Sequence, residues 1–327
     1  MKTVDLFSGC GGLSLGFSKA GFQIEAALEY WEQANSIYQS NFEHPVFAHD
    51  LSDTSGALKI ISKFKPSVII GGPPCQDFSS AGKRDESLGR ADLTLSFADL
   101  ICKYKPAWFV MENVQRIVKS NILARVIKQY EASGYGLTAV VLDASYCGAP
   151  QARLRFFLIG RLSDDHNFLL KSLSMGLRKS PMTMREYFGD TLETEFYYRH
   201  PRNYSRRAVY SLDEPSATIR GVNRPVPEGY KRHPLDPVDV RKVKVRPLTT
   251  LERAQVQTFP KSFKFLGSKT AVEQMIGNAV PPALAKFVGR AILKYESDPE
   301  KFRTEETTLF GRGQLLIPNA PLHKQRH

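Results

Sequence analysis

The stretch KTVDLFSGCGGLSLGFSKAG, residues 2–21, decides the fold class of this 327-residue chain. An apolar run leads into Gly9, Gly11 and Gly12, and a helical pattern follows at once. A strand, a glycine turn and a helix in this order are typical of the first unit of a doubly wound α/β sheet, where backbone can approach a nucleotide-like ligand. The dinucleotide fingerprint G-x-G-x-x-G is incomplete, because Ser14 stands at its third glycine. The glycines alone therefore fit either a ligand-binding turn or a purely structural one.

Outward from this unit, short apolar runs alternate with helical stretches as far as about Gly160. This alternation predicts an α/β domain with a doubly wound, mostly parallel sheet over residues 1–164. The strands are expected at KTVDLF, QIEAALE, VFAHD, SVIIGG, WFVMEN, LTAVVLDA and RLRFFLIG.

The regular pattern is lost after residue 164, where prolines, scattered aromatics and basic residues take its place. We expect a smaller, loop-rich domain over residues 165–270. A helix with apolar residues on one face is predicted within residues 271–300 and should return to the first domain. Residues 301–327 are mostly polar and are expected to form a tail.

Basic residues gather in the second half of the chain. The net charge is +12, from 45 Lys and Arg against 33 Asp and Glu. Residues 1–145 hold 14 basic and 15 acidic side chains, a net of −1, which leaves +13 for residues 146–327. A near-neutral half joined to a strongly basic one indicates a catalytic core beside a surface for nucleic acid. A solvated basic face is the alternative.

The cysteines and apolar runs exclude several classes of protein. Cys10, Cys75, Cys102 and Cys147 are too far apart for a zinc or disulfide framework, so no metal site is expected. The apolar runs are much shorter than the roughly 20 residues of a membrane-spanning helix. The N-terminus also lacks the apolar region of a secretory signal. We therefore expect a cytoplasmic protein with no membrane partner.

Acidic residues at predicted strand ends define a candidate ligand crevice. Glu29 ends the second strand and Asp50 ends the third, so both should lie at the carboxyl edge of the sheet. Carboxylates there suit ribose hydroxyls and an adenine amino group, and they suit a polyphosphate badly. A nucleoside with a cationic sulfonium fits, which makes S-adenosylmethionine the candidate cofactor. Phe7 and Tyr30 are expected either to flank the adenine ring or to be core aromatics.

The next two strand ends carry a thiol and a carboxyl group. The fourth strand ends in GGPPCQDFSSAG, residues 71–82, where two prolines stiffen the backbone before Cys75. A thiol in a rigid loop is a candidate nucleophile. The following strand ends in MENV with Glu112. Neighbouring strand ends should therefore present Cys75 and Glu112 to one crevice.

Taken together, these segments resemble the C5-cytosine DNA methyltransferases. The matching segments follow the family's order and cover nearly the whole chain except roughly residues 165–245. They are DLFSGCGG, Glu29, Asp50, PPCQ, ENV, QARLR at residues 151–155, RPLTTLERAQVQTFP at 246–260 and GNAVPPALA at 277–285. One departure is Arg90-Ala91-Asp92-Leu93, where the family usually has Arg-Gly-x-Leu.

The resemblance implies a mechanism and an S-adenosylmethionine-dependent methyltransferase fold. The Cys75 thiolate would add to C6 of a flipped-out cytosine, while Glu112 holds a proton at N3. Arg153 and Arg155, expected on one face of a strand, would clamp the base, its sugar phosphate and the Cys75 loop; a surface pair of arginines is the alternative. The base that removes the C5 proton is not identified, and water would serve. The product is S-adenosylhomocysteine, and no metal is implied.

Further site residues follow from the resemblance by position. The cofactor would be held by Phe7, Ser8, Gly9, Gly11, Gly12, Leu13, Glu29, Tyr30, Asp50, Leu51, Pro73, Leu93, Asn278, Ala279 and Val280. Double-stranded DNA would be contacted by Gln76, Ser79, Gln151, Arg206, Arg207, Arg220 and Arg224. Among these, Arg206 and Arg207 are expected to meet phosphates and Arg220 a base. The domain between QARLR and RPLTT corresponds to the family's target-recognition lobe.

The resemblance favours a monomeric modification enzyme of a bacterial restriction system, whose endonuclease is a functional rather than a physical partner. Two alternatives remain. A tRNA cytosine methyltransferase of the same fold would share PPCQ and ENV, although the Cys-Phe-Thr tripeptide associated with that branch is absent. An inactive DNA-binding regulator would keep the fold, but the presence of Cys75 and Glu112 argues against it.

Overall fold

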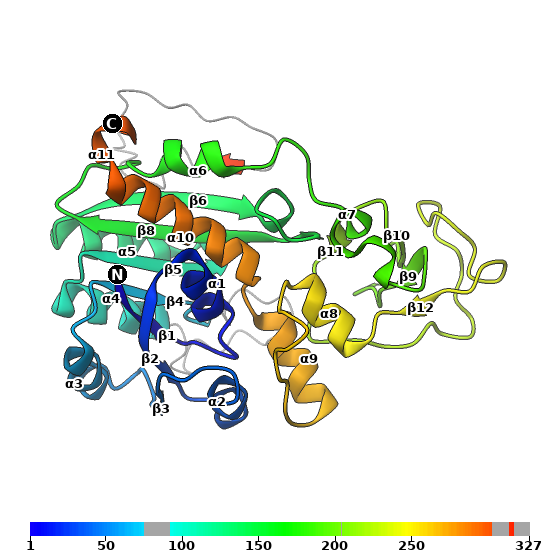
Figure 1. Ribbon diagram of the computed structural model, residues 1–327, viewed down its shortest axis with the longest axis horizontal. Coiled ribbons are helices and arrows are strands. Elements are labelled where there is room, and N and C mark those ends of the chain that lie inside the picture. Colours follow the sequence, from blue (N-terminus) through cyan, green and yellow to red (C-terminus); the bar gives the residue numbers. More distant parts are fainter. Residues whose placement is uncertain (75–91, 204, 303–313, 317–327) are drawn as a thin grey trace.

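The computed structural model describes residues 1–74, 92–203, 205–302 and 314–316. Its centre is an eight-stranded sheet, flanked by helices, with a smaller lobe beyond one end of the strands (Figure 1). The strands lie in the order β13-β6-β8-β5-β4-β1-β2-β3. Their bounds are β1 (Lys2–Leu6), β2 (Gln23–Glu29), β3 (Val46–Ala48), β4 (Val68–Gly71), β5 (Trp108–Val114), β6 (Tyr135–Asp143), β8 (Leu154–Leu162) and β13 (Gln314–Leu316).

Five neighbouring strands, from β3 to β5, are parallel, as the alternation predicted. Strand β8 is the exception to this parallel arrangement, because it pairs antiparallel with both β5 and β6. In Figure 1, β6 runs toward the lobe and β8 runs away from it. Because β1, β4 and β5 run in the same direction as β6, their carboxyl ends face the lobe.

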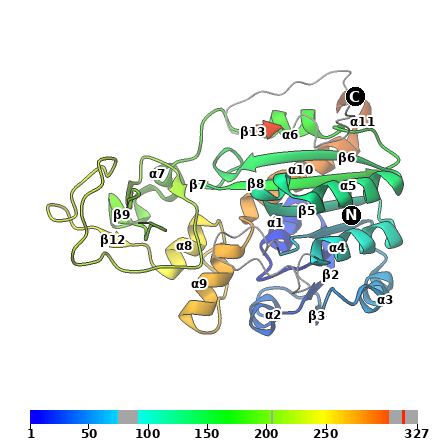
Figure 2. The same cartoon turned by 180° about the vertical axis from the view of Figure 1, so that it is seen from behind.

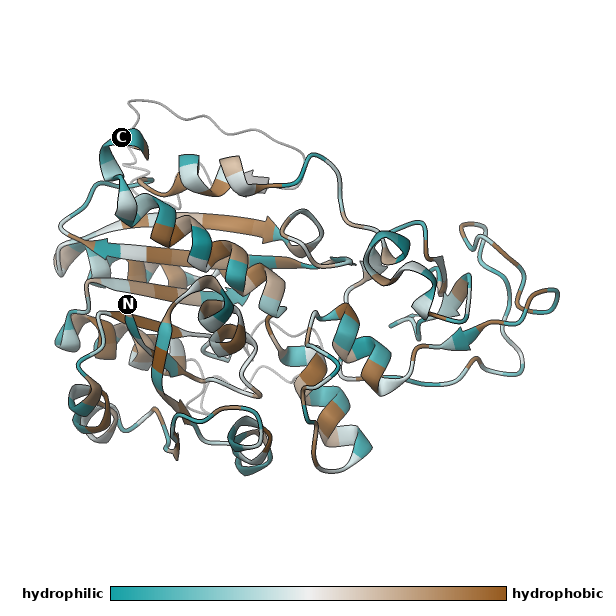
Figure 3. Ribbon diagram, in the orientation of Figure 1, coloured by the Kyte–Doolittle hydropathy of each residue, from teal (hydrophilic) through white to brown (hydrophobic). Residues whose placement is uncertain are grey.

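Two apolar cores cover the two faces of the sheet. The first contains side chains of α1 (Gly12–Ala20), α6 (Leu170–Gly176) and α10 (Pro282–Ser297). The second contains those of α3 (Thr54–Phe64), α4 (Asp92–Tyr104) and α5 (Asn121–Ala132), which lie on the face seen in Figure 2. Since both faces are covered, the central strands are rich in apolar residues, and the four residues of β4, VIIG, are all buried, as the brown stretches of the sheet in Figure 3 indicate.

The lobe is built from short elements around a third apolar core. A three-stranded sheet, β10-β9-β12, lies beside α7, and the two-residue strands β7 and β11 join the lobe to the main sheet. Ala34 and Ile37 of α2 (Glu32–Gln39) belong to this core, so the lobe also packs on the first domain. The remaining bounds are β7 (Gln151–Ala152), α7 (Met184–Phe188), β9 (Phe196–Tyr198), β10 (Val209–Ser211), β11 (Ser216–Ala217), β12 (Arg246–Pro247), α8 (Thr250–Val256), α9 (Lys269–Asn278) and α11 (Pro299–Phe302), with 3-10 turns at Gln115–Lys119, Ala144–Tyr146 and Gly189–Thr191.

Packing divides the chain differently from the expected domains 1–164, 165–270, 271–300 and 301–327. Phe168, Leu169 and Leu173 are buried in the first core, against α10, although they follow residue 164. Phe302 is buried in the same core, and β13 extends the sheet by pairing antiparallel with β6. Parts of the expected tail are therefore structural. None of the helices in the described residues is long and apolar enough to cross a membrane.

Candidate active site

The glycine turn between β1 and α1 needs its glycines for two different reasons. Gly9 and Gly11 have φ angles of +53° and +92°, which side chains rarely adopt. Gly12 is in the helix, but a Cβ there would lie 2.3 Å from the carbonyl oxygen of Val280. The turn therefore presses against the segment that precedes α10. This contact brings two groups of the predicted cofactor residues together, Gly9 to Leu13 and Asn278 to Val280.

Glu29 faces this turn from the end of β2. Its Oε2 accepts a hydrogen bond of 2.8 Å from the backbone N–H of Gly9, and its Oε1 accepts one of 2.8 Å from Trp31. The next residue, Tyr30, is 74% exposed, which excludes the alternative that it is a core aromatic. Phe7 is partly buried against the second core, with φ of +56°.

Asp50 lies two residues beyond β3 and is exposed. Its carboxylate accepts a hydrogen bond of 2.9 Å from the backbone of Ser52. Hydrogen bonds from Ser52 lower the pKa of Asp50, so it is ionised at neutral pH. Leu51 beside it is buried, and Leu93 is half-buried near the start of α4. The exposed Asn278 accepts a hydrogen bond of 3.2 Å from Gln274.

The features of this edge fit a nucleoside cofactor. The turn has backbone at positive φ, and two acids lie at or just beyond the ends of the neighbouring strands β2 and β3. The buried hydroxyl of Ser8 has no partner among the described residues, so it can bond to a ligand. Among those residues no group of His, Cys, Asp and Glu side chains could hold a metal ion.

Beneath the turn is a polar network that sequence reasoning missed. Asp5 of β1 is fully buried, and its Oδ2 accepts hydrogen bonds from Ser14, 3.2 Å from the backbone nitrogen and 2.7 Å from Oγ. The Tyr38 hydroxyl donates to Ser14 Oγ at 2.6 Å and lies 2.7 Å from His44 Nε2. Burial raises the pKa of Asp5 to about 7, against the opposing hydrogen bonds from Ser14. An aspartate inside an otherwise apolar strand was the available signal.

The ends of β4 and β5 meet as the sequence predicted. A Cβ on Gly72 would lie 3.2 Å from Glu112 Oε2, so the backbone passes close to this carboxyl group. The Asn113 side chain donates a hydrogen bond of 3.1 Å to the carbonyl of Pro73, two residues before Cys75. It thereby fixes the start of the segment that leads to the candidate nucleophile. Three predicted residues, Cys75, Gln76 and Ser79, lie outside the described residues.

Glu112 is almost completely buried and pairs with Arg155. The Arg155 Nε lies 2.9 Å from Glu112 Oε1, across the antiparallel pair formed by β5 and β8. Burial raises the pKa of Glu112 above its usual range, against the opposing effect of Arg155 and Arg153. The Glu112 carboxyl group is therefore protonated more readily in this site than it would be in water.

Arg153 occupies a different position from the one expected. It lies between β7 and β8 rather than within a strand as predicted, although its charge still acts on both Arg155 and Glu112. Its guanidinium is buried and donates to three backbone carbonyls, those of Ile219 at 2.9 Å, Gly277 at 2.8 Å and Ala279 at 3.0 Å, with a longer fourth bond of 3.5 Å to that of Asn278. Arg153 thus joins the lobe, the segment before α10 and the main sheet. The alternative of a surface arginine pair is also excluded.

Gln151 is fully buried beside it, so the expected contact with DNA does not fit this structure. Its side chain donates to Gln257 at 2.7 Å and accepts from the Ile219 backbone at 2.7 Å. Gln257 in turn donates to the carbonyls of Ile276 and Ala279. A second polar link therefore runs in parallel with Arg153 between the lobe and α10. The position of Gln257 in a helical run gave no signal of this role.

The predicted DNA-binding arginines differ in whether their guanidinium groups are already paired within the protein. The Arg207 guanidinium pairs with both carboxylate oxygens of Glu214 and lies 4.5 Å over the Tyr210 ring, so phosphate contact would require breaking this pair. Arg206 and Arg224 are exposed, and neither side chain bonds to another described residue. Arg220 donates to the carbonyl of His200, and its Nε has no partner among the described residues.

Cations gather around Arg220 at a small pocket of the lobe. The lining includes Tyr198, Arg199, His200, Arg220 and Arg253. Burial lowers the pKa of Arg220 to about 10, and the charges of Arg199 and Arg202 act in the same direction. The lobe thus holds mutually repelling guanidiniums that an anion would stabilise.

Comparison with known proteins agrees with this geometry. The family model of C-5 cytosine-specific DNA methylase matches residues 1–294. The type II methyltransferase M.HindV of Haemophilus influenzae is 62% identical over 299 residues, 91% of this chain and 98% of its own. M.HgiDI of Herpetosiphon aurantiacus is 53% identical, over 91% of this chain and 96% of its own. In fold, the chain is similar to S. pombe Dnmt2, with a TM-score of 0.67 at 19% identity over 91% of this chain and 99% of that one.

Proposed function

This chain belongs to the C-5 cytosine-specific DNA methylase family and is a DNA (cytosine-5)-methyltransferase, and we propose how its residues carry out the transfer. The observation that carries the proposal is the buried Glu112–Arg155 pair beside the backbone of Gly72 and Pro73. It lies at the same sheet edge as the glycine turn. This shared edge supports a proposal in which base chemistry and cofactor binding take place side by side.

S-adenosylmethionine would be held by the turn, with Glu29 and Asp50 accepting hydrogen bonds from its nucleoside. When bound, the cofactor supplies a methyl group activated by the positive sulfonium. No metal is needed, because that activation is already present. The hydroxyl of Ser8 and the exposed ring of Tyr30 would complete the site.

Cytosine C5 is a weak nucleophile, so the chain must activate it. The Cys75 thiolate adds to C6 and forms an S–C6 bond, and the electron pair displaced from the C5–C6 bond makes C5 nucleophilic. Glu112 holds a proton at N3, which makes C6 electrophilic, and its raised pKa supports this role. Arg155 would keep the Glu112 carboxyl group oriented toward the base. After C5 takes the methyl group, a base or water removes the C5 proton and the S–C6 bond breaks to release Cys75.

The substrate is double-stranded DNA whose target cytosine leaves the helix, because C6 cannot be reached within the stack. The lobe would read the sequence, with Arg206 and Arg224 as free phosphate contacts and Arg220 toward the bases. We further propose a monomer acting in the bacterial cytoplasm beside a separate restriction endonuclease. The high identity to type II methyltransferases favours DNA over the tRNA alternative.

The decisive experiment uses a duplex in which 5-fluorocytosine replaces the target cytosine, after bisulfite sequencing has located that base. Fluorine cannot leave C5 as a proton does, so a covalent protein–DNA adduct should accumulate in the presence of S-adenosylmethionine. Cys75→Ala should form no adduct but still bind DNA. Cys102→Ala is the matched control, because this half-buried thiol lies near the end of α4 that is opposite to Leu93 and should leave the adduct unchanged. An adduct with Cys75→Ala on a denaturing gel would rule out Cys75 as the nucleophile.

A further inference from the structure

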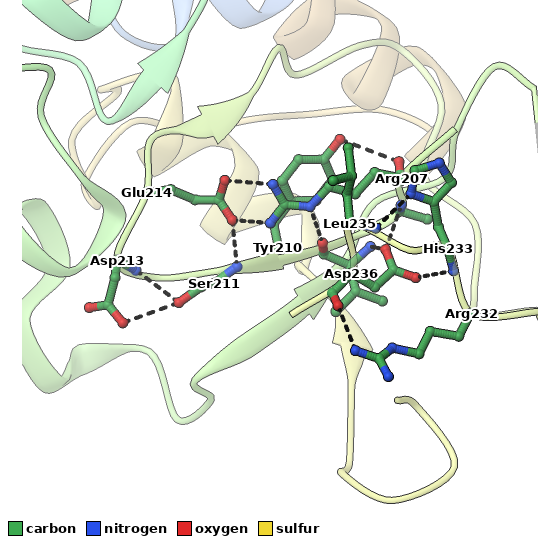
Figure 4. A network of polar contacts seen from close by, with 11 residues as sticks. Arg207, Tyr210, Ser211, Asp213, Glu214, Arg232, His233, Leu235 and Asp236 are labelled. Carbon is green, nitrogen blue, oxygen red and sulfur yellow. Dashed lines mark hydrogen bonds and ion pairs between the residues drawn. The ribbon is translucent and has the colours of Figure 1, made fainter. Parts of the chain in front are cut away.

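A long connection of the lobe, between β11 and β12, contains a turn with an ordered polar anchor. The turn is YKRHPLD, residues 230–236, and its anchor is the buried carboxylate of Asp236. One oxygen accepts hydrogen bonds from the backbones of Ala208, at 3.2 Å, and Val209, at 3.0 Å. The other accepts from the Tyr230 hydroxyl at 2.6 Å and the His233 backbone at 2.8 Å (Figure 4). Two of these bonds fix the turn to the start of β10, and the other two close the turn on itself.

The tip of the turn is stiff as well as anchored. Pro234 and Pro237 restrict the backbone on either side of Leu235. The Leu235 backbone N–H donates to His233 Nδ1 at 3.1 Å, and the Arg232 guanidinium donates to the Asp236 carbonyl at 3.2 Å. Although burial opposes it, hydrogen bonding lowers the pKa of Asp236, so the anchor stays ionised at neutral pH.

Leu235 is nevertheless 69% exposed at this rigid tip. A single exposed leucine is ordinary on a protein surface. This one differs because its backbone is held in place, so a partner would meet it without a large loss of conformational entropy. Leu235 does not belong to the lobe's own core, so packing in that core does not explain a leucine at this tip.

The charges around the tip indicate a polyanionic partner. Lys231 and Lys242 are exposed, and neither makes an ion pair with another described residue. Two of the nearby carboxylates are already engaged, Asp236 in the anchor and Asp239 with Arg241, while Glu228 is exposed just before the turn. The Tyr230 ring also packs edge-on against Tyr198, 5.7 Å between centroids, and Tyr198 lines the arginine pocket. The turn is therefore continuous with the surface to which DNA contacts were assigned above.

We propose that the 230–236 turn is a preorganised DNA-contacting element, in which Leu235 meets base edges in a groove while Lys231 contacts a flanking phosphate. The proposal rests on the proposed function, since its partner is the duplex substrate. Duplex DNA offers a partner for both side chains, because it has phosphates for Lys231 and apolar base groups, such as the thymine methyl group, for Leu235. Leu235 would then add to sequence preference without donating a hydrogen bond.

The test measures binding of the full-length protein to its cognate duplex and to an unrelated duplex over a salt series, with S-adenosylhomocysteine present. Leu235→Ala should weaken cognate binding by about 5- to 30-fold, with an unchanged salt slope and much less effect on the unrelated duplex. Lys231→Ala should weaken both duplexes and reduce the salt slope by about 0.9. Leu266→Ala is the matched control, because Leu266 is also exposed but follows a segment bonded to Asn41 of the first domain.

Cognate binding by Leu235→Ala that equals wild type would overturn the proposal, and so would an equal loss on both duplexes. Thermal unfolding and calorimetric cofactor affinity of each variant should match wild type, because Leu235 lies outside the cores and the cofactor site. If the wild-type protein bound neither duplex, the proposed function itself would fail. The two failures are therefore distinguishable.

Discussion

Replacing Asp5 by asparagine should change how the stability of the folded protein depends on pH. The Asp5 side chain is fully buried beneath the glycine turn, and its Oδ1 has no hydrogen-bond partner among the described residues. Burial raises its pKa from 3.8 to about 7, the Ser14 hydrogen bonds oppose that rise, and the charge of Glu29 adds to it. In the unfolded chain the carboxyl group would titrate near its ordinary value, about 3.9.

The size and sign of the effect follow from linkage. Between about pH 4 and pH 7 the folded protein holds a proton on Asp5 that the unfolded chain has lost, so stability falls as pH rises through this window. A difference of roughly three between the folded and unfolded pKa values, at about 1.36 kcal/mol for each unit, corresponds to about 4 kcal/mol. The asparagine amide has no proton to lose. The free energy of unfolding of Asp5→Asn, relative to wild type, should therefore rise by about that amount from pH 4 to pH 7.5 and then level off.

Urea unfolding at half-unit pH steps, followed by circular dichroism, measures this difference directly. Ser14→Ala is the matched perturbation: it removes a donor to the carboxylate, so the pKa of Asp5 should rise further and the window should extend to higher pH. In the Asp5→Asn background the same change should have no pH-dependent effect. A difference between Asp5→Asn and wild type that stays flat from pH 4 to 7.5 would refute the argument.

Two further predictions concern backbone packing. Gly12→Ala should destabilise the protein by about 1 to 3 kcal/mol and weaken cofactor binding in calorimetry, because the new Cβ would meet the Val280 carbonyl. Gly9→Ala should disturb packing less, because a Cβ at that position would have no atom within 4 Å. Arg153→Lys should cost about 2 to 5 kcal/mol in urea unfolding, since a single ammonium cannot replace a guanidinium bonded to three carbonyls; stability within about 0.5 kcal/mol of wild type would contradict that role.

The sequence predicted which strand ends meet because one rule of topology governs them. Carboxyl ends of parallel strands meet at one edge, so Glu29 and Glu112 had to lie near the glycine turn once the strands were assigned. The direction of β8 could not be obtained in this way. Its apolar run fits a buried strand of either direction, and the antiparallel pairing with β5 and β6 depends on the path of the chain between them.

The roles of individual polar residues were harder to predict, because they depend on contacts far along the chain. Arg153 bonds to Ile219 and Gly277, and Gln151 to Gln257, more than 60 residues away in each case. The run that contains Arg206 and Arg207 gives no sign that Glu214 neutralises only Arg207. A basic segment indicates an anion partner, but the internal ion pairs decide which cations are left to meet it.

Ser14 shows how the first turn can lack the third glycine of the dinucleotide fingerprint and still hold its helix against its strand. In that fingerprint the third glycine serves close packing of the helix against the strand. Here the same position bonds to Asp5 through both its backbone N–H and its hydroxyl, which ties α1 to β1 by hydrogen bonds instead. Close packing of α1 occurs on another side, where Cβ atoms on Gly12 and Gly16 would lie 2.3 Å from atoms of Val280 and Ala285. The glycines therefore allow α10 and the segment before it to pack against the turn, which brings Val280 beside the proposed cofactor residues of that turn.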